Sequence, residues 1–284
     1  MKRNIGFGDL PAEFRSKSNS RIVIVPVPYD KTSTWIKGAD KGPQAIIEAS
    51  ANMELYDIET DSEIFRLGIF TDKPVICKTA PEKMISLVEK RVDNHLAREK
   101  FVVVIGGEHS VSAGAVKAHA KKYKKISVLQ LDAHSDLRNE YHGSKYNHAC
   151  MMARIREICP IVQVGIRSMD ISEKKYLDYK RVFFAEDTHK DNKWIDKVAS
   201  RLTENVYITI DLDCFDPSVM PSTGTPEPGG LLWYDCLSLL KKVSSKKNVI
   251  GFDVVEMCPN KQNKAPDFLA AKLIYKLLSY IKWD

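Results

Sequence analysis

The 284-residue sequence lacks several features that mark whole classes of protein. It has no run of about 18 apolar residues, which excludes a membrane-spanning helix. Residues 1–14 contain no long apolar stretch, so no signal peptide is expected. The six cysteines show neither CxxC nor zinc-finger spacing, a pattern typical of reduced thiols that are mostly buried. Together these absences predict a cytoplasmic protein with no membrane partner.

The chain also lacks a basic stripe, although its formal net charge is +6. Its lysines are scattered and do not interleave with aromatic residues, so no nucleic-acid partner is expected. A hydrophobic content of 44% and a charged content of 28% are typical of a globular protein. No internal repeat, low-complexity tract or linker rich in Pro, Gly or Ser divides the sequence. We therefore predict a single domain over residues 1–284.

Short apolar, β-branched runs alternate with amphipathic stretches along the chain. We predict strands at 21–27, 65–70, 101–107, 126–132, 161–167, 181–186, 205–213 and 248–256. We predict helices at 42–57, 81–100, 109–123, 148–158, 172–180, 194–204, 231–245 and 267–283. The strand segments lack strict polar alternation, which indicates burial on both faces. The pattern predicts a three-layer α/β/α fold around a central, mostly parallel eight-stranded sheet.

Three residues that favour metal ions follow the predicted strand at 126–132. Asp132, His134 and Asp136 occupy every second position in "DAHSD". If the backbone stays extended, such residues project to one side and face one point. Two carboxylates at one point resist ionising together unless a positive charge neutralises them. Ligands of α/β folds collect at the carboxyl ends of strands, so we expect a cation here.

Two other strand ends supply matching groups. Asp211 and Asp213 end the strand at 205–213, and His109 follows the strand at 101–107 after two glycines. The expected ligands are His109, Asp132, His134, Asp136, Asp211 and Asp213. Four carboxylates and two neutral imidazoles carry a charge of −4, which two divalent cations would balance. Carboxylate-rich sites with imidazole suit manganese, and other first-row metals are possible.

Four segments carry a resemblance to a known family. "GGEHS", "DAHSD", "DLDCFDPSVMPSTGTPEPGG" and "VVEMCPN" resemble, in order and spacing, the signature blocks of the ureohydrolases. These are the binuclear manganese hydrolases of the arginase and agmatinase family, and "GADKGPQAI" is similar to their N-terminal segment. The resemblance implies two Mn²⁺ ions on the six ligands, with Asp136 and Asp213 bridging them alongside one other group. It also implies a homo-oligomer, a trimer or a hexamer.

The resemblance assigns further residues to the site. His148 in "YNHACMM" matches the catalytic histidine, although Asn147 and Ala149 replace the family's usual Ser and Gly neighbours. Glu256 matches the glutamate that holds the substrate guanidinium, and Thr225 is expected to orient that group. Without the resemblance, His148 reads as a hydrogen-bonded histidine at a helix start, and Glu256 as a surface ion-pair carboxylate.

The reaction implied is hydrolysis of a guanidino group to urea and an amine. Asp136 would aim the attacking water, Glu256 would fix the guanidinium, and His148 would protonate the leaving amine. The loop "LRNEYHGSKYN" (137–147) is most similar to the agmatinase branch, so agmatine is the expected substrate. Glu140 would meet its distal ammonium, whereas Arg138 would suit a carboxylate instead.

Three alternatives stay open at this point. Guanidinobutyrate, arginine and formiminoglutamate share a similar reacting end with agmatine. Histone deacetylases, more distant relatives, use one zinc ion and a pair of adjacent histidines, which this chain does not contain. A catalytically inactive metal-binding relative should have lost Glu256, His148 or a ligand, and none is missing.

Overall fold

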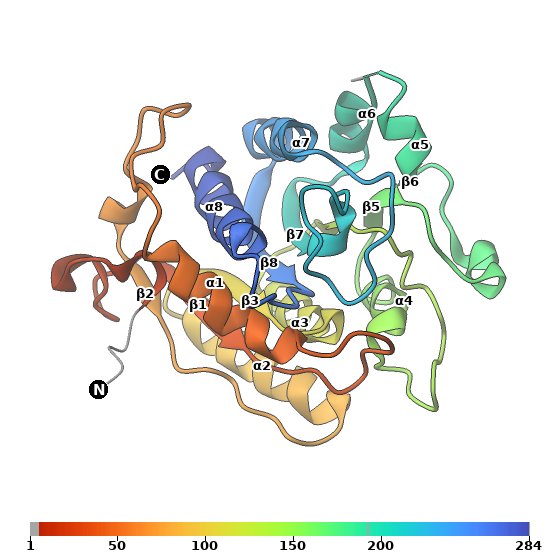
Figure 1. The fold of residues 1–284 in the computed structure, drawn as a ribbon, viewed down its shortest axis with the longest axis horizontal. Helices are drawn as coiled ribbons and strands as arrows, with labels where there is room; N and C mark the ends of the chain where they lie inside the picture. The colour runs from red at the N-terminus through yellow and green to blue at the C-terminus, as the bar shows by residue number, and fades with distance from the viewer. Residues whose placement is uncertain (1–5, 192, 284) are drawn as a thin grey trace.

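The computed structural model describes residues 6–191 and 193–283. Its centre is one eight-stranded sheet in which every strand pairing is parallel (Figure 1). The strands are β1 (Ile22–Val27), β2 (Ile69–Thr71), β3 (Phe101–Gly106), β4 (Ile126–Leu131), β5 (Ile161–Ile166), β6 (Val182–Phe184), β7 (Asn205–Asp211) and β8 (Asn248–Val255). They lie in the order β2-β1-β3-β8-β7-β4-β5-β6. The predicted eight-stranded sheet is confirmed.

Helices cover both faces of this sheet (Figure 1). The α-helices are α1 (Gly42–Ser50), α2 (Pro81–Leu96), α3 (Ser112–Lys122), α4 (Met151–Ile155), α5 (Ala185–Thr188), α6 (Lys193–Arg201), α7 (Trp233–Lys246) and α8 (Ala265–Tyr280). One apolar core joins the sheet to α1, α6, α7 and α8, and a second joins it to α2, α3 and α4. The three-layer prediction is therefore confirmed.

Side-chain alternation along the strands divides the two cores. Ile22 and Ile24 of β1 belong to the first core, whereas Val23 and Val25 belong to the second. Successive side chains of a strand point to opposite faces, so a fully apolar run supplies both. This explains why the strand segments show no polar alternation in the sequence.

Some predicted boundaries were wrong. The segment predicted as a strand at 65–70 begins as a 3₁₀ helix, Ile64–Leu67, and pairs only from Ile69. Gly68 separates the two with φ of 76°, a backbone conformation that suits glycine. The helix predicted at 172–180 is a 3₁₀ helix, η7 (Ile171–Tyr176). Apolar periodicity does not distinguish a 3₁₀ turn from the start of a longer element.

The strand order places four motif-bearing strand ends side by side. β3, β8, β7 and β4 are consecutive in the sheet, and all their carboxyl ends point the same way because the sheet is parallel. Groups that follow these strands therefore converge at one edge, which is where ligands of open α/β sheets bind.

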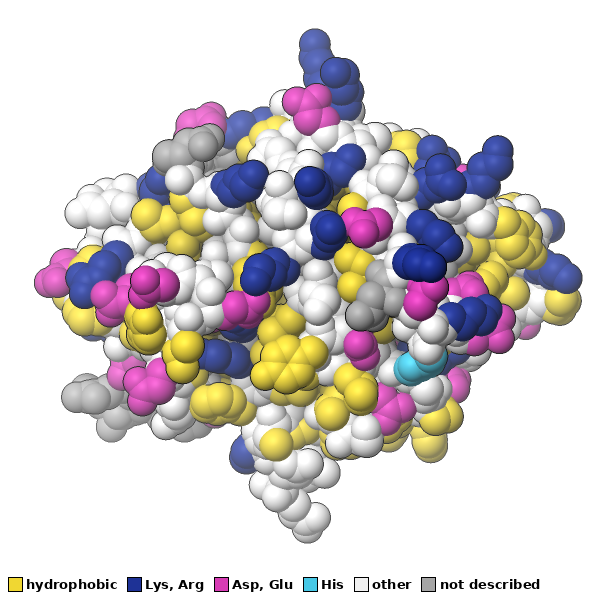
Figure 2. All heavy atoms as spheres, turned by 90° about the horizontal axis from the view of Figure 1, so that it is seen from above, with side chains coloured by type: hydrophobic (Ala, Val, Ile, Leu, Met, Phe, Trp, Pro, Cys, Tyr) yellow, Lys and Arg dark blue, Asp and Glu magenta, His cyan; other side chains and the backbone are white. Residues whose placement is uncertain are grey.

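The surface has a dispersed charge pattern. Figure 2 shows Lys and Arg side chains spread over one face, with Asp and Glu side chains among them.

Within residues 6–191 and 193–283, no helix combines the length and apolar character needed to cross a bilayer.

Candidate active site

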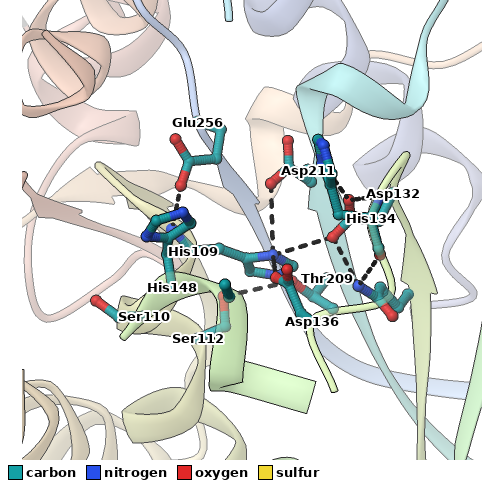
Figure 3. A network of polar contacts seen from close by, with 12 residues as sticks. His109, Ser110, Ser112, Asp132, His134, Asp136, His148, Thr209, Asp211 and Glu256 are labelled. Carbon is teal, nitrogen blue, oxygen red and sulfur yellow. Dashed lines mark hydrogen bonds and ion pairs between the residues drawn. The ribbon is translucent and has the colours of Figure 1, made fainter. Parts of the chain in front are cut away.

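His109 is the centre of a buried cluster of carboxylates at the sheet edge. It begins a 3₁₀ turn, η5 (His109–Val111), which two residues separate from the end of β3. Its Nδ1 lies 3.1 Å from Asp132 Oδ2, 3.0 Å from Asp136 Oδ2 and 3.4 Å from Asp211 Oδ2. Figure 3 shows these three carboxylates around the His109 ring. Oxygen and nitrogen atoms at this spacing can converge on one cation.

Hydrogen bonds on the other side of the ring orient His109. Its Nε2 lies 2.9 Å from Thr209 Oγ1, and that hydroxyl donates to Asp253 Oδ1 at 2.6 Å. The hydroxyl thus accepts from Nε2–H, which leaves Nδ1 without a proton in the neutral ring. Nδ1 is buried and has no hydrogen-bond partner. An orphaned imidazole nitrogen of this kind, backed by a fixed partner on the opposite nitrogen, is what a metal ligand requires.

His134 forms the second cluster. Its Nδ1 lies 2.9 Å from Asp213 Oδ2 and 3.6 Å from Asp132 Oδ1. Two trios, His109–Asp132–Asp211 and Asp132–His134–Asp213, each hold their ligand atoms within 4.8 Å of one another. Asp132 is common to both, with one oxygen toward each histidine.

The predicted bridging of two metals by Asp136 and Asp213 stays a prediction. Asp132 approaches both histidines, whereas Asp136 lies beside His109 and Asp213 lies beside His134. The reason is local: β4 ends at Leu131, so Asp132 sits at the strand end between the two histidines.

The backbone beyond β4 does not stay extended to Asp136. Asp136 has a φ of 52°, a left-handed conformation that is uncommon for a residue other than glycine. The turn brings its carboxylate back beside His109. Glu173, on η7, anchors the loop by accepting from the Leu137 backbone N–H at 2.9 Å and from the Ser135 hydroxyl. The grouping was predicted, but a turn and not alternation achieves it.

The charge balance of the cluster also favours cations. Burial and the Asp213 and Asp132 charges raise the pKa of Asp211 well above its usual value. Burial and Asp132 raise the pKa of Asp136 to about 7. Burial lowers the pKa of His134, but Asp213 and Asp132 outweigh it and raise that pKa to about 12. Carboxylates that lie this close together retain protons, because their negative charges repel one another. Divalent cations would neutralise these negative charges instead. The residues present therefore fit two metal ions.

Glu256 lies beside the cluster at the end of β8. Its Oε1 accepts the His109 backbone N–H at 2.6 Å, and its φ of 63° is again left-handed. A Cβ atom built on Gly224 would lie 3.8 Å from Oε2, so the 224–225 backbone runs close to this carboxylate. One cavity of about 270 Å³ is lined by Glu256, Thr225 and five of the six candidate metal ligands, His109, His134, Asp136, Asp211 and Asp213. Glu256 is buried there with an oxygen available to a cation, not in a surface ion pair.

His148 lines the same cavity from a different element. It begins the 3₁₀ helix η6 (His148–Cys150), where the Asn147 side chain accepts the Ala149 backbone N–H at 3.1 Å. Asn is as good an N-cap as Ser, so this replacement keeps the helix start in place. Burial lowers the pKa of His148 to about 4, and positive charge on His109 and His134 acts in the same direction.

The outer part of the cavity is lined by side chains from two loops. Glu140 is exposed and is not among the lining side chains. Arg138 and Tyr141, from the same loop, do line it, together with Asp170 and Glu173 from the η7 region. Asp170, from a segment that follows β5, thus supplies a carboxylate to the outer cavity, and the predicted contact of Glu140 with a distal ammonium stays a prediction.

Sequence analysis missed several residues that organise the site. Arg167 follows β5 and donates to the carbonyl oxygens of Asp213, Glu227 and Pro228 at 2.7, 2.8 and 3.0 Å. It holds the loop after β7 in place. The sequence feature that could have identified Arg167 is a basic residue at the end of a predicted strand, in "GIRS". The hydrogen bonds of Glu173 had no signal in the sequence.

Comparisons with known proteins agree with this geometry. Residues 20–279 match the arginase family. The N(1)-aminopropylagmatine ureohydrolase of Synechocystis sp. is 38% identical over 276 residues, covering 93% of this chain and 90% of that protein. The agmatinase of Pyrococcus horikoshii is 33% identical over 261 residues, covering 90% of each chain. The crystal structure of the agmatine ureohydrolase of Thermoplasma volcanium has a TM-score of 0.86 at 33% identity, covering 94% of this chain and 92% of that one.

These matches cover the segments that converge at the sheet edge. The four motifs that resemble the family in sequence lie within residues 20–279. Three of them supply the two histidine clusters, and the fourth supplies Glu256 beside them. The agreement of family match, fold and site leads to one conclusion: the chain belongs to the arginase family.

Proposed function

We propose that this arginase-family hydrolase cleaves a linear guanidino amine of the agmatine type to urea and an amine, using two divalent metals, of which Mn²⁺ is the best match. The observation that carries the proposal is that Glu256 and His148 line the same cavity as both histidine clusters. A merely metal-stabilised protein has no need of a guanidinium-binding carboxylate and an imidazole beside its metal ligands. The predicted cytoplasmic location and assembly into a trimer or hexamer stay predictions.

The side chains divide the work of binding and attack. Two divalent cations held by the His109 and His134 clusters would lower the pKa of a water bound to them and neutralise the carboxylates. Glu256 accepts charge-assisted hydrogen bonds from the planar guanidinium, and Thr225 orients it from the neighbouring loop. Asp136, beside His109, accepts a hydrogen bond from the attacking water and aims it at the guanidinium carbon.

His148 completes the reaction by moving one proton. Water adds to the guanidinium carbon and loses one proton to Asp136. The substituted nitrogen takes a proton from protonated His148 as its bond to that carbon breaks. The hydroxyl proton of the intermediate then goes to the departing amine, and the proton held by Asp136 returns to His148. The products are urea and an ammonium ion, so the overall charge of +1 is kept. Burial lowers the pKa of His148 to about 4, which makes its protonated form a strong acid toward an amine.

The charges around Arg138 favour a cationic tail over a carboxylate. Among the described residues that line the cavity, Arg138 is the one Lys or Arg. Its guanidinium lies 3.5 Å from Glu173 Oε1, 3.6 Å from Asp170 Oδ2 and 4.5 Å from the Tyr141 ring centre. Two carboxylates already face this one cation. The α-carboxylate of arginine would therefore lack a partner, at a cost of several kcal/mol.

A longer polyamine is a second candidate substrate. Relatives named N(1)-aminopropylagmatine ureohydrolase, from Synechocystis sp. and from Thermus thermophilus, are each 38% identical to this chain. Asp170 has a side chain 38% exposed at the outer part of the cavity, where it could meet an additional ammonium group. This candidate uses the same reacting end and the same metal site.

Substrate comparison tests the proposal. With Mn²⁺ present, kcat/KM would be measured by product release for agmatine, N(1)-aminopropylagmatine, arginine, 4-guanidinobutyrate and formiminoglutamate. We expect one of the two amines to exceed each carboxylate-bearing compound by at least about 100-fold, because an unpaired buried charge discriminates strongly. A clear advantage for arginine, 4-guanidinobutyrate or formiminoglutamate would contradict the cationic-tail assignment.

A pair of variants distinguishes two candidate carboxylates for the distal ammonium, Asp170 in the outer cavity and Glu140 outside it. Asp170→Asn keeps the hydrogen-bond acceptor that starts η7 but removes the charge, so KM for the amines should rise about 5- to 10-fold. Glu140→Gln is the matched control, and its KM should stay within about 2-fold because an exposed charge contributes little. The reverse pattern would restore the original assignment of Glu140.

A further inference from the structure

One hydroxyl group stands between a buried carboxylate and the ring of His148. Thr32 lies in the segment between β1 and the 3₁₀ helix Ala39–Lys41. Its Oγ1 is 2.7 Å from Glu108 Oε1, 2.9 Å from the His148 backbone N and 3.1 Å from His148 Nδ1. The three groups belong to three separate loops, 76 and 116 residues apart from Thr32 in sequence.

Glu108 is surrounded by hydrogen-bond donors. Its Oε2 accepts the backbone N–H groups of Lys31 at 2.7 Å, Thr32 at 2.5 Å and Ser33 at 3.3 Å. Its Oε1 accepts the Ser110 hydroxyl at 2.6 Å as well as that of Thr32. With donors on both oxygens, the carboxylate acts as an acceptor. The Thr32 hydroxyl must therefore direct its single proton to Glu108.

The direction of that proton decides what Thr32 offers to His148. A hydroxyl that has donated its proton keeps two acceptor sites. The His148 backbone N–H takes one, at 2.9 Å, and the ring nitrogen Nδ1 faces the other, at 3.1 Å. Nδ1 must then carry a hydrogen, which leaves Nε2 as the nitrogen that gains and loses a proton.

We propose that Thr32 is a positioning residue for catalysis: backed by Glu108, it holds His148 in the Nδ1–H tautomer with Nε2 free to serve the reaction. This inference rests on the proposed function, in which His148 protonates the leaving amine. In that step the Nε2–H bond breaks and an N–H bond forms on the amine, while the Nδ1–H to Thr32 hydrogen bond stays intact throughout.

The arrangement also links substrate binding to proton transfer. Ser33, Trp35 and Ile36 follow Thr32 in the chain and line the active-site cavity. Glu108 precedes the metal-ligand candidate His109. The same loop that borders the substrate therefore sets the ring orientation of His148.

Removal of the hydroxyl provides the test. Thr32→Val keeps the shape of the side chain but cannot accept a hydrogen bond from His148. We therefore expect kcat to fall about 10- to 100-fold, which is the usual cost of losing a group that orients a catalytic or metal-bound imidazole. KM should change by less than about 3-fold, because Glu256 still holds the guanidinium. Thr32→Ser keeps the hydroxyl and should restore kcat to within about 3-fold of the native enzyme.

The pH dependence of kcat provides a second measurement, which a general loss of packing around Thr32 would not change. An acceptor at Nδ1 stabilises protonated His148, so its loss should shift the limb of the kcat profile that His148 controls to lower pH. Thr203→Val is the matched control. Its hydroxyl donates to the Asn205 carbonyl oxygen at 3.1 Å and lies 2.9 Å from Ser127 Oγ, at the amino ends of the strands and away from the cavity. That variant should lose stability but keep both kcat and the pH profile.

A double-mutant cycle distinguishes failure of this inference from failure of the proposed function. In a His148→Ala background, Thr32→Val should have no further effect on kcat, because the ring that it orients is gone. An undiminished effect there would overturn the positioning role. Normal kcat in His148→Ala alone would instead overturn the proton-donor assignment of the proposed function.

Glu108→Gln gives a second variant should Thr32→Val fold poorly. The three backbone donors keep the amide oxygen at the Oε2 position, which places the amide NH₂ beside Thr32. The hydroxyl must then accept from the amide and donate to Nδ1, which reverses the tautomer. A fall in kcat of about 10-fold or more supports the inference, and an unchanged kcat and pH profile contradict it.

Discussion

His109 and His119 lie ten positions apart and are both buried, but their surroundings have opposite effects on a proton. His109 faces three carboxylates at the sheet edge, and although burial lowers its pKa, Asp132 and Asp136 raise that pKa well above the usual value. His119 packs between α3 and the sheet, 4.8 Å from the Tyr207 ring, with Nδ1 against the Ala115 carbonyl at 2.8 Å. Burial there lowers the pKa to about 4.

The comparison shows that burial alone does not determine the role of a histidine. Around His119, packed apolar and aromatic groups favour the neutral ring and contribute to stability. Around His109, the fold holds several carboxylates close together. Without cations, the repulsion between their negative charges costs free energy of folding. Polar groups at the sheet edge should therefore control activity, and those beneath α3 should control stability.

The largest expected effect is at the sheet edge. Asp213→Ala removes the carboxylate nearest to His134 and should reduce kcat by more than the roughly 100-fold that loss of a supporting residue costs. The secondary structure should stay intact, because Asp213 lies beyond the last paired residue of β7. Metal content and kcat would be measured together. One tightly bound zinc per fully active chain would contradict the two-metal assignment.

The next effect distinguishes two residues of the same cavity. His148→Ala should lower kcat by about 10²- to 10⁴-fold, because a positioned proton donor is lost from the transition state. Glu256→Ala should also raise KM, since its carboxylate binds the guanidinium before and during the reaction. Steady-state kinetics across the pH range provide the measurement. Near-normal kcat in His148→Ala at every pH would exclude it as the donor.

The His119 region should show its effect in stability at acid pH. The folded-state pKa of about 4 lies below the ordinary 6.5, so between these values the unfolded chain binds a proton that the folded chain does not. Stability is therefore full above pH 6.5 and falls as the pH drops toward 4, by about 3 kcal/mol from this group.

Chemical denaturation at several pH values would measure this loss, with a chelator present throughout so that metal release does not contribute. The control is His119→Gln, which lacks the titrating ring and should show a shallower decline than the native chain over that interval. Equal declines in the two proteins would show that His119 is not responsible.

The smallest effect tests the packing beneath the sheet. A Cβ on Gly114 of α3 would lie 2.5 Å from the Ile85 carbonyl oxygen and 2.8 Å from Val88 Cβ of α2. Gly114→Ala should therefore cost about 1–3 kcal/mol of stability through overpacking. The kcat of the folded fraction should not change. A stabilised Gly114→Ala protein would mean that α2 and α3 separate without cost, and a large loss of kcat would remove the division between the two regions.

The sequence by itself determined the layers, the eight strands and the ends at which ligands gather. Apolar runs such as 101–107 and 205–213 carry that information locally, because side-chain alternation follows directly from residue order. All six predicted metal ligands lie in the two histidine clusters or beside them for the same reason.

Only the tertiary structure decided which groups share a partner. Asp132 and not Asp136 belongs to both clusters, because the backbone leaves the extended conformation after β4. Asp170, and not Glu140, lines the outer cavity, and Thr32 lies between Glu108 and His148. Each of these contacts joins loops that are far apart in sequence, and their proximity depends on the strand order β1-β3-β8-β7-β4-β5, which residue periodicity does not encode.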